Sequence, residues 1–115
     1  MLINRTLKIF AVVLAIVSIP TMVFAVPQFP HIFYGDITIN GNPAPVGTAV
    51  IAKVGGVEKG RIITTQSGKY GGPNAYDSKL LVQGSDLSGG DIINFTFFGI
   101  NASERALFES GAITR

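Results

Sequence analysis

Apolar and polar residues alternate with a period of two along most of the chain after residue 30. Between residues 31 and 40, Phe33, Ile37 and Ile39 share one side and the polar residues share the other. Such alternation is typical of a half-buried β-strand. The clearest case is 91–99, where Ile93, Phe95 and Phe97 point one way. The same pattern predicts strands over residues 31–40, 48–54, 57–65, 79–83 and 91–99.

The C-terminal part of the chain admits two interpretations. Residues 103–109 contain the helix-favouring types Glu, Arg, Ala and Leu, but Ala106 and Phe108 also fit an outgoing strand. An isolated helix of one or two turns is marginal in water, so we predict a strand. Residues 111–115 are expected to form a short final strand or a tail.

Glycine and proline divide these strands. Gly55 and Gly56 predict a two-residue hairpin, because glycine readily adopts positive φ. Further turns or loops are expected at 40–45, 66–78, 84–90 and 98–102, and a proline-containing linker at 26–30. Strands spaced in this way predict an all-β fold, an Ig-like sandwich of about seven strands over residues 31–115.

Residues 1–25 differ in kind from the rest. Arg5 and Lys8 precede an uncharged apolar run at 9–19, which is followed by Pro20 and the small residue Ala25. This layout predicts a signal-peptide helix that is cleaved after Ala25, and therefore a secreted, extracellular or cell-envelope location. The alternative is a retained membrane anchor, because residues 9–26 carry no charge.

Composition excludes several classes of function. Residues 26–115 contain seven basic and seven acidic side chains, so the predicted mature chain has no net charge. Nucleic-acid binding needs clustered cations, and none are present in this sequence, so we exclude nucleic-acid partners. The absence of cysteine removes disulfides, thiol catalysis and cysteine-ligated zinc.

No constellation of residues predicts catalysis, and we expect neither an enzyme nor a cofactor. His31 is the only histidine, and we interpret it as a packing residue. Asp86 and Asp91 flank a turn and could contribute oxygen ligands to calcium, but turn aspartates more often bond their own backbone. The glycine-rich run at 68–73 lacks the full spacing of a phosphate-binding loop.

Two surface features are candidates for binding or modification. Tyr70 and Tyr76, on the loop at 68–78, together with Tyr34, could stack on a carbohydrate or contact a peptide; alternatively, each is an amphipathic residue at the core edge. Asn94 and Asn101 stand in N-x-[ST] sequons and are candidate glycosylation sites. Asn94 is expected to face outward from its strand, and Asn101 to lie in a turn.

Four motifs, in this order, resemble a known family. They are PHIFYGDITING at 30–41, PAPVGT at 43–48, GKYGGP at 68–73 and FESG at 108–111. Together they resemble carboxypeptidase regulatory-like and collagen-adhesin B-type modules of secreted archaeal and bacterial surface proteins. The resemblance implies a prealbumin-like Greek-key β-sandwich with a structural or adhesion role.

The chain departs from this family in two respects. Members continue past the position of Arg115 to complete the last strand, so we expect a short or open sheet edge near Ile113. An open edge can recruit a strand, which makes self-association or binding to other surface or envelope proteins the expected partnership. The first strand lacks a lysine, so the isopeptide crosslink of collagen-adhesin modules is not expected. Contact with a membrane is expected only if the leader is retained.

Overall fold

The computed structural model describes residues 28–115, so the predicted signal-peptide helix and its cleavage site lie outside the described residues. The described part contains strands and turns and no helix. Its eleven strand segments are β1 (His31–Phe33), β2 (Gly35–Asp36), β3 (Thr38–Ile39), β4 (Asn42–Pro43), β5 (Ala49–Val54), β6 (Val57–Ile63), β7 (Lys69–Tyr70), β8 (Leu80–Val82), β9 (Ile92–Phe97), β10 (Ile100–Leu107) and β11 (Ile113–Thr114).

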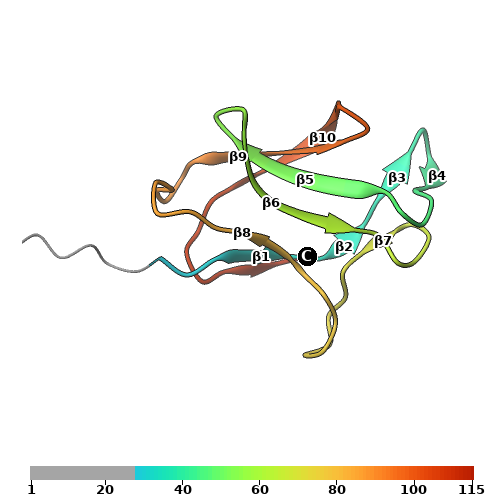
Figure 1. Cartoon of the computed structure of the whole chain (residues 1–115), viewed down its shortest axis with the longest axis horizontal. Helices are drawn as coiled ribbons and strands as arrows, with labels where there is room; N and C mark the ends of the chain where they lie inside the picture. Colours follow the sequence, from blue (N-terminus) through green and yellow to red (C-terminus); the bar gives the residue numbers. More distant parts are fainter. Residues whose placement is uncertain (1–27) are drawn as a thin grey trace, which may run out of the picture.

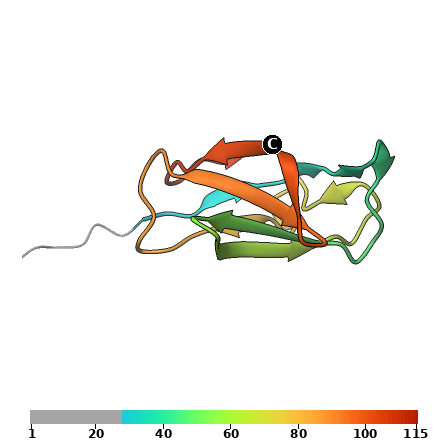
Figure 2. The ribbon, with the colours of Figure 1, turned by 90° about the horizontal axis from the view of Figure 1, so that it is seen from above.

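Two larger sheets dominate the arrangement. One has the order β10-β9-β5-β6 and the other the order β11-β1-β8, so together they contain seven strands. They lie one above the other in Figure 1, and Figure 2 shows them from above. The pairs β2–β7 and β3–β4 extend this arrangement at one end. The all-β prediction is confirmed, and the layering is sandwich-like.

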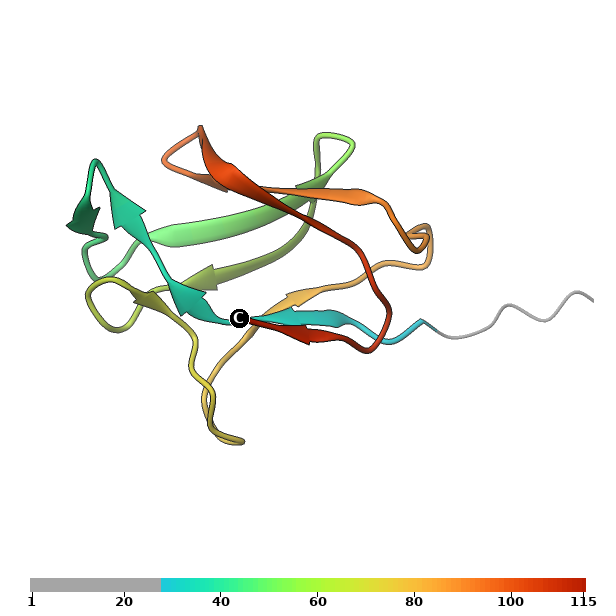
Figure 3. The same cartoon turned by 180° about the vertical axis from the view of Figure 1, so that it is seen from behind.

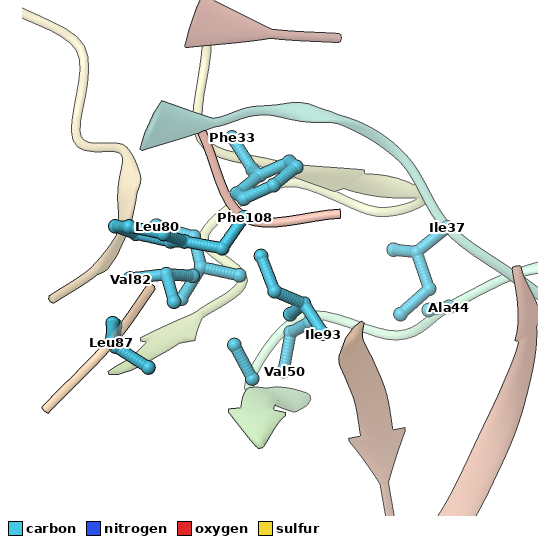
Figure 4. Close-up of a cluster of buried hydrophobic side chains, with 10 residues drawn as sticks. Phe33, Ile37, Ala44, Val50, Leu80, Val82, Leu87, Ile93 and Phe108 are labelled. Atoms are coloured by element: carbon cyan, nitrogen blue, oxygen red, sulfur yellow. The ribbon is translucent and has the colours of Figure 1, made fainter. Parts of the chain in front are cut away.

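The core lies between the two larger sheets. On β8, Leu80 and Val82 are fully buried, whereas Leu81 between them is 39% exposed. Phe33 of β1 and Ile93 of β9 are buried from opposite layers, as the period-two pattern predicts. Figure 4 shows most of the labelled side chains gathered together, with Ile37 and Ala44 to one side of the others. Within residues 28–115, the buried apolar residues are Phe33, Ile37, Ala44, Val50, Ala52, Leu80, Val82, Leu87, Ile93 and Phe108.

The predicted Gly55–Gly56 hairpin is confirmed. Both residues have positive φ, 59° and 79°, and they join β5 to β6. Two central residues with positive φ form the turn that matches the natural twist of paired strands. Asn40 and Gly41, with φ of 52° and 78°, make an equivalent connection between β3 and β4.

The predicted single strand at 31–40 is instead three short segments, because the run changes partner twice. Phe33 pairs with β8, Gly35 with β7 and Thr38 with β4. The alternation of buried and exposed residues nevertheless continues through the run. The pairs at 42–43 and 69–70 fall where glycine and proline predicted loops.

Residues 103–109 follow the strand prediction, since β10 extends over Ile100–Leu107. The turn predicted at 98–102 is longer than the turn in the structure. Only Phe98 and Gly99 reverse the chain, with φ of 51° and 73°. Asn101 therefore lies in β10, paired with Thr96, and not in a turn.

The two layers approach each other at one side only. There, the Gln83 N–H of the chain leaving β8 donates to Lys59 O of β6 at 3.1 Å. At the other side, β10 and β11 are the outermost strands of their sheets and do not pair with each other. This difference between the two sides positions the site described next.

Candidate functional site

A cleft of about 520 Å³ lies between β10 on one side and β2 with the end of β11 on the other. We call it the edge cleft. Figure 3 shows β10 and the C-terminus on either side of this region. Its lining residues are Phe33, Gly35, Asp36, Ile37, Val50, Tyr70, Phe95, Phe97, Ala102, Glu104, Arg105, Ala106, Thr114 and Arg115.

The floor of the edge cleft is part of the hydrophobic core. Phe33 and Val50 are only 2% and 3% exposed, and Phe95 and Phe97 are partly buried against the same core. The rings of Phe33 and Phe95 meet edge to face, with centroids 5.2 Å apart. Of these four residues, Phe95 and Phe97 are therefore the apolar side chains that the fold leaves incompletely covered at the cleft.

One wall is polar around Tyr70. The ring of Tyr70 lies over Gly35, where an added Cβ would stand 3.5 Å from the hydroxyl oxygen. Burial raises the pKa of the Tyr70 hydroxyl, and the nearby carboxylates of Glu104 and Asp36 raise this pKa further. Two carboxylates, those of Asp36 and Glu104, thus lie near Tyr70 at this wall of the cleft.

His31 forms hydrogen bonds to the C-terminal segment beside the cleft. Its Nδ1 accepts a hydrogen bond from the Glu109 N–H at 3.1 Å, so Nε2 carries the proton and donates to Thr114 Oγ1 at 2.8 Å. The imidazole also stacks on Phe33, with centroids 4.0 Å apart. Burial lowers the pKa of His31, although the charge of Glu109 opposes this. These contacts fit the packing role predicted for this residue.

Tyr70 and Tyr76, predicted on one ligand loop, lie in different environments. Tyr70 is half-buried and lines the edge cleft, whereas Tyr76 is fully exposed on the loop between β7 and β8. This loop projects away from the sheets in Figures 1 and 3. Asp77 Oδ2 accepts from the Asn74 N–H at 2.9 Å, which stabilises the turn beside Tyr76.

A second cavity, of about 420 Å³, lies at the base of the same loop. It is bounded by Lys69 from β7, by Asp77 from the loop and by Arg61 from β6. Neither Tyr70 nor Tyr76 lines it. Ligand binding by the 68–78 loop stays a prediction, with Tyr76 as its accessible aromatic residue.

The two candidate glycosylation sites differ in accessibility. Asn101 is exposed on the outermost strand β10. Asn94 is half-buried on the inner strand β9, between its pairing partners Arg105 and Lys53. Asn101 is therefore the more accessible acceptor.

The two aspartates considered as calcium ligands have other partners. Asp86 forms an ion pair with Lys59 at 2.8 Å, and Asp91 Oδ2 accepts from the Ser88 N–H at 2.8 Å. Within residues 28–115, no group of three or more His, Cys, Asp or Glu side chains is placed to hold a metal ion. The same residues contain no helix that could cross a membrane.

Sequence reasoning missed an apolar feature at the tip of the β9–β10 hairpin. Phe98 and Ile100 are 67% and 62% exposed there. The alternating residues on both sides of Phe98-Gly99 could have limited the predicted turn to these two residues. Phenylalanine is not a turn-forming residue, so the local signal was weak.

Comparison of this chain with protein-family models, with curated proteins and with solved structures finds no match. The class of protein therefore follows from the structure itself. It is an all-β module with two principal sheets and, at one open side, a cleft with an apolar floor.

Proposed function

We propose that the chain is a non-enzymatic structural or adhesion module that is exported and joins other surface or envelope proteins through a sheet edge. The observation that carries this proposal is the open side between β10 and β11, where sheet edges flank a cleft with an apolar floor. Unpaired edges of this kind template pairing with another chain. The leader pattern in residues 1–25 supports export.

We further propose that the two principal sheets belong to a prealbumin-like Greek-key sandwich. The seven strands of those sheets and the four ordered motifs of the carboxypeptidase regulatory-like resemblance support this assignment. Modules of this kind serve as spacers or adhesive units in larger surface proteins, which agrees with a small neutral domain without cysteine.

The proposal is tested by following the full chain in a prokaryotic host. The intact mass of the exported protein is expected to correspond to cleavage after Ala25, and any added glycan would appear in the same spectrum. Protease added to intact cells should digest the protein. An unprocessed chain that stays in the cytoplasm would contradict the proposal, and an unprocessed chain in the membrane fraction would favour the anchor alternative.

A second candidate function is carbohydrate or peptide binding by the 68–78 loop. The full exposure of Tyr76 on a projecting loop favours it, because exposed aromatic rings stack on ligands. Binding on a glycan array that is lost in Tyr76→Ala would support this candidate. Phe98→Ala is the matched control, because Phe98 is an exposed aromatic residue between β9 and β10, outside this loop. A blank array would contradict carbohydrate binding.

A further inference from the structure

The hydrogen-bond ladder between β1 and β11 leads directly into the edge cleft. Ile32 N–H donates to Ala112 O at 2.9 Å, and Tyr34 N–H donates to Thr114 O at 3.2 Å. The two strands run parallel. Thr114 and Arg115, at the end of this ladder, line the cleft.

Asp36 is the next residue, after Ile32 and Tyr34, whose backbone groups face the side on which β11 lies. Alternate residues of a strand direct their N–H and C=O groups to the same side, so those of Asp36 point to the side of β11, as those of Tyr34 do. The backbone N–H of Ile37 points to the opposite side, where it donates to Gly68 O at 2.9 Å. The backbone of Asp36 therefore offers a donor and an acceptor to a further strand in the cleft.

The cleft also has room for side chains from such a strand. On the β10 side the wall includes two small residues, Ala102 and Ala106. Below them lie the apolar side chains of Val50, Phe95 and Phe97. A strand in this position would turn every second residue toward this floor, so alternating apolar residues fit it.

The opposite strand, β10, is less suited to provide a continuous ladder. Its pairing with β9 shifts between Asn101 and Arg105, where β10 has three residues against the single residue Phe95. A bulge of this kind bends an edge strand and interrupts regular pairing. An entering strand is therefore expected to pair with β2, parallel to it, and to pack against β10 by its side chains.

Charge restricts the chemistry of the entering strand. Asp36 and Glu104 both line the cleft beside Tyr70, and both raise its pKa through their negative charge. A basic side chain near this wall would be attracted, and an acidic one would be repelled. Arg105 and Arg115, at the same cleft, provide positive charge beside this acidic pair.

We propose that the edge cleft binds an extended segment of a partner protein, about five residues long, with alternating apolar residues and a flanking basic residue. The segment adds to the sheet parallel to β2, by backbone hydrogen bonds to Asp36, and packs its apolar residues on the partly exposed Phe95 and Phe97. Five residues span about 16 Å. This inference rests on the proposed structural function and specifies how the module joins a partner.

The test uses the exported protein and a blocked seven-residue peptide that alternates valine and threonine between two terminal lysines. Binding is measured by isothermal titration calorimetry, and amide hydrogen exchange is followed residue by residue. We expect binding together with at least tenfold slower exchange of the Asp36 amide. Two control peptides are expected to bind at least tenfold more weakly, one with its valines contiguous and one with glutamates in place of the lysines.

Two variants locate the peptide. Ala106→Trp fills the cleft from β10 and is expected to weaken binding at least tenfold, whereas Ala75→Trp, on the exposed loop beside Tyr76, is expected to bind normally. Circular dichroism confirms that both variants are folded. If Ala106→Trp does not fold, the exchange of the Asp36 amide in the unmodified protein decides the question.

Three results would overturn the inference. They are no binding at the solubility limit of the peptide, equal binding by the Ala106→Trp variant, and unchanged exchange at Asp36. Dimerisation of the protein alone that Ala106→Trp abolishes would place a second copy in the cleft and would also overturn it. None of these results bears on export, so the proposed function fails or stands separately through its own mass and protease measurements.

Discussion

Gly60 of β6 lies against the carbonyl oxygen of Leu81 on β8, with no space between them for a side chain. A Cβ at Gly60 would collide with this backbone oxygen and would stand 3.5 Å from Leu80 Cδ1. Since this contact lies where the two larger sheets approach each other, glycine at position 60 sets their separation on that side.

Gly60→Ala is expected to destabilise the protein by about 1–3 kcal/mol, because the added methyl group forces the two strands apart. Gly89→Ala is the matched control, since a Cβ there would meet nothing within 4 Å. Urea unfolding measures the free energy of each variant. Equal stability of the two variants would show that the contact does not constrain the sheets.

Leu80 and Leu81 are neighbours on β8 that face opposite sides. Leu80→Ala is expected to cost about 2–5 kcal/mol, because it removes a fully buried side chain and leaves a cavity. Leu81→Ala, at a position that is 39% exposed, is expected to cost less than half as much. Thermal unfolding of both variants compares the two faces, and a reversed order would contradict the described core.

The stability of the fold is expected to rise with pH through the titration of His31. Burial lowers the pKa of this group in the folded state below its ordinary value of 6.5, so the unfolded chain binds the proton more readily. The contribution of His31 is therefore complete above pH 6.5 and is lost as the pH falls from 6.5 toward the lower folded pKa. A proton on Nδ1 would also displace the Glu109 N–H bond.

His31→Phe tests this account. The variant is expected to be less stable by about 1–3 kcal/mol at neutral pH, because the buried hydrogen bonds of His31 are lost. The difference from the unmodified protein should narrow as the pH falls below 6.5, since protonation weakens the histidine contacts. Urea unfolding over a pH series measures both effects. A constant difference at all pH values would contradict the role given to His31.

Phe98 occupies a backbone conformation that favours asparagine or glycine, with φ of 51°. Its side chain is 67% exposed, so little packing compensates for the strain. Phe98→Asn is expected to stabilise the hairpin by about 1 kcal/mol, while Phe98→Val should destabilise it. Thermal unfolding distinguishes these outcomes. A loss of stability in Phe98→Asn would mean that the phenyl ring makes a contact that stabilises the fold.

Asp86 provides a local electrostatic test. The hydrogen bond from Lys59 is the largest cause that lowers the pKa of Asp86 below 3.8. Lys59→Met is therefore expected to raise the pKa of Asp86, which NMR titration of its carboxyl carbon can follow. Because Asp86 is exposed, the effect on stability at low pH should be small.

The core and the hairpins could be predicted from the sequence because they depend on local signals. Alternation identified Phe33 and Ile93 as buried, and the adjacent glycines at 55 and 56 identified their turn. The turn predicted at 98–102 was too long, because only Phe98 and Gly99 reverse the chain and a phenylalanine side chain gives no local preference for positive φ. Asn101 was consequently misplaced.

The edge cleft could not be predicted in detail, because it depends on pairings between distant parts of the chain. The sequence indicated an open edge near Ile113, but not that Glu104 and Tyr70 would meet at the cleft. The three strands that pair in turn with residues 31–40 could not be predicted either. Alternation of apolar and polar residues determines which side of a strand is buried, but it does not determine which strand pairs with it.

The parallel pairing of β1 with β11 has a mechanical consequence. Tension applied to the N-terminal end of β1 and to the C-terminal end of β11 would pull the two strands past each other. Their hydrogen bonds, from Ile32 to Ala112 and from Tyr34 to Thr114, would then be strained at the same time, not opened one after another. A module linked in series by these two ends would resist extension through this strand pair.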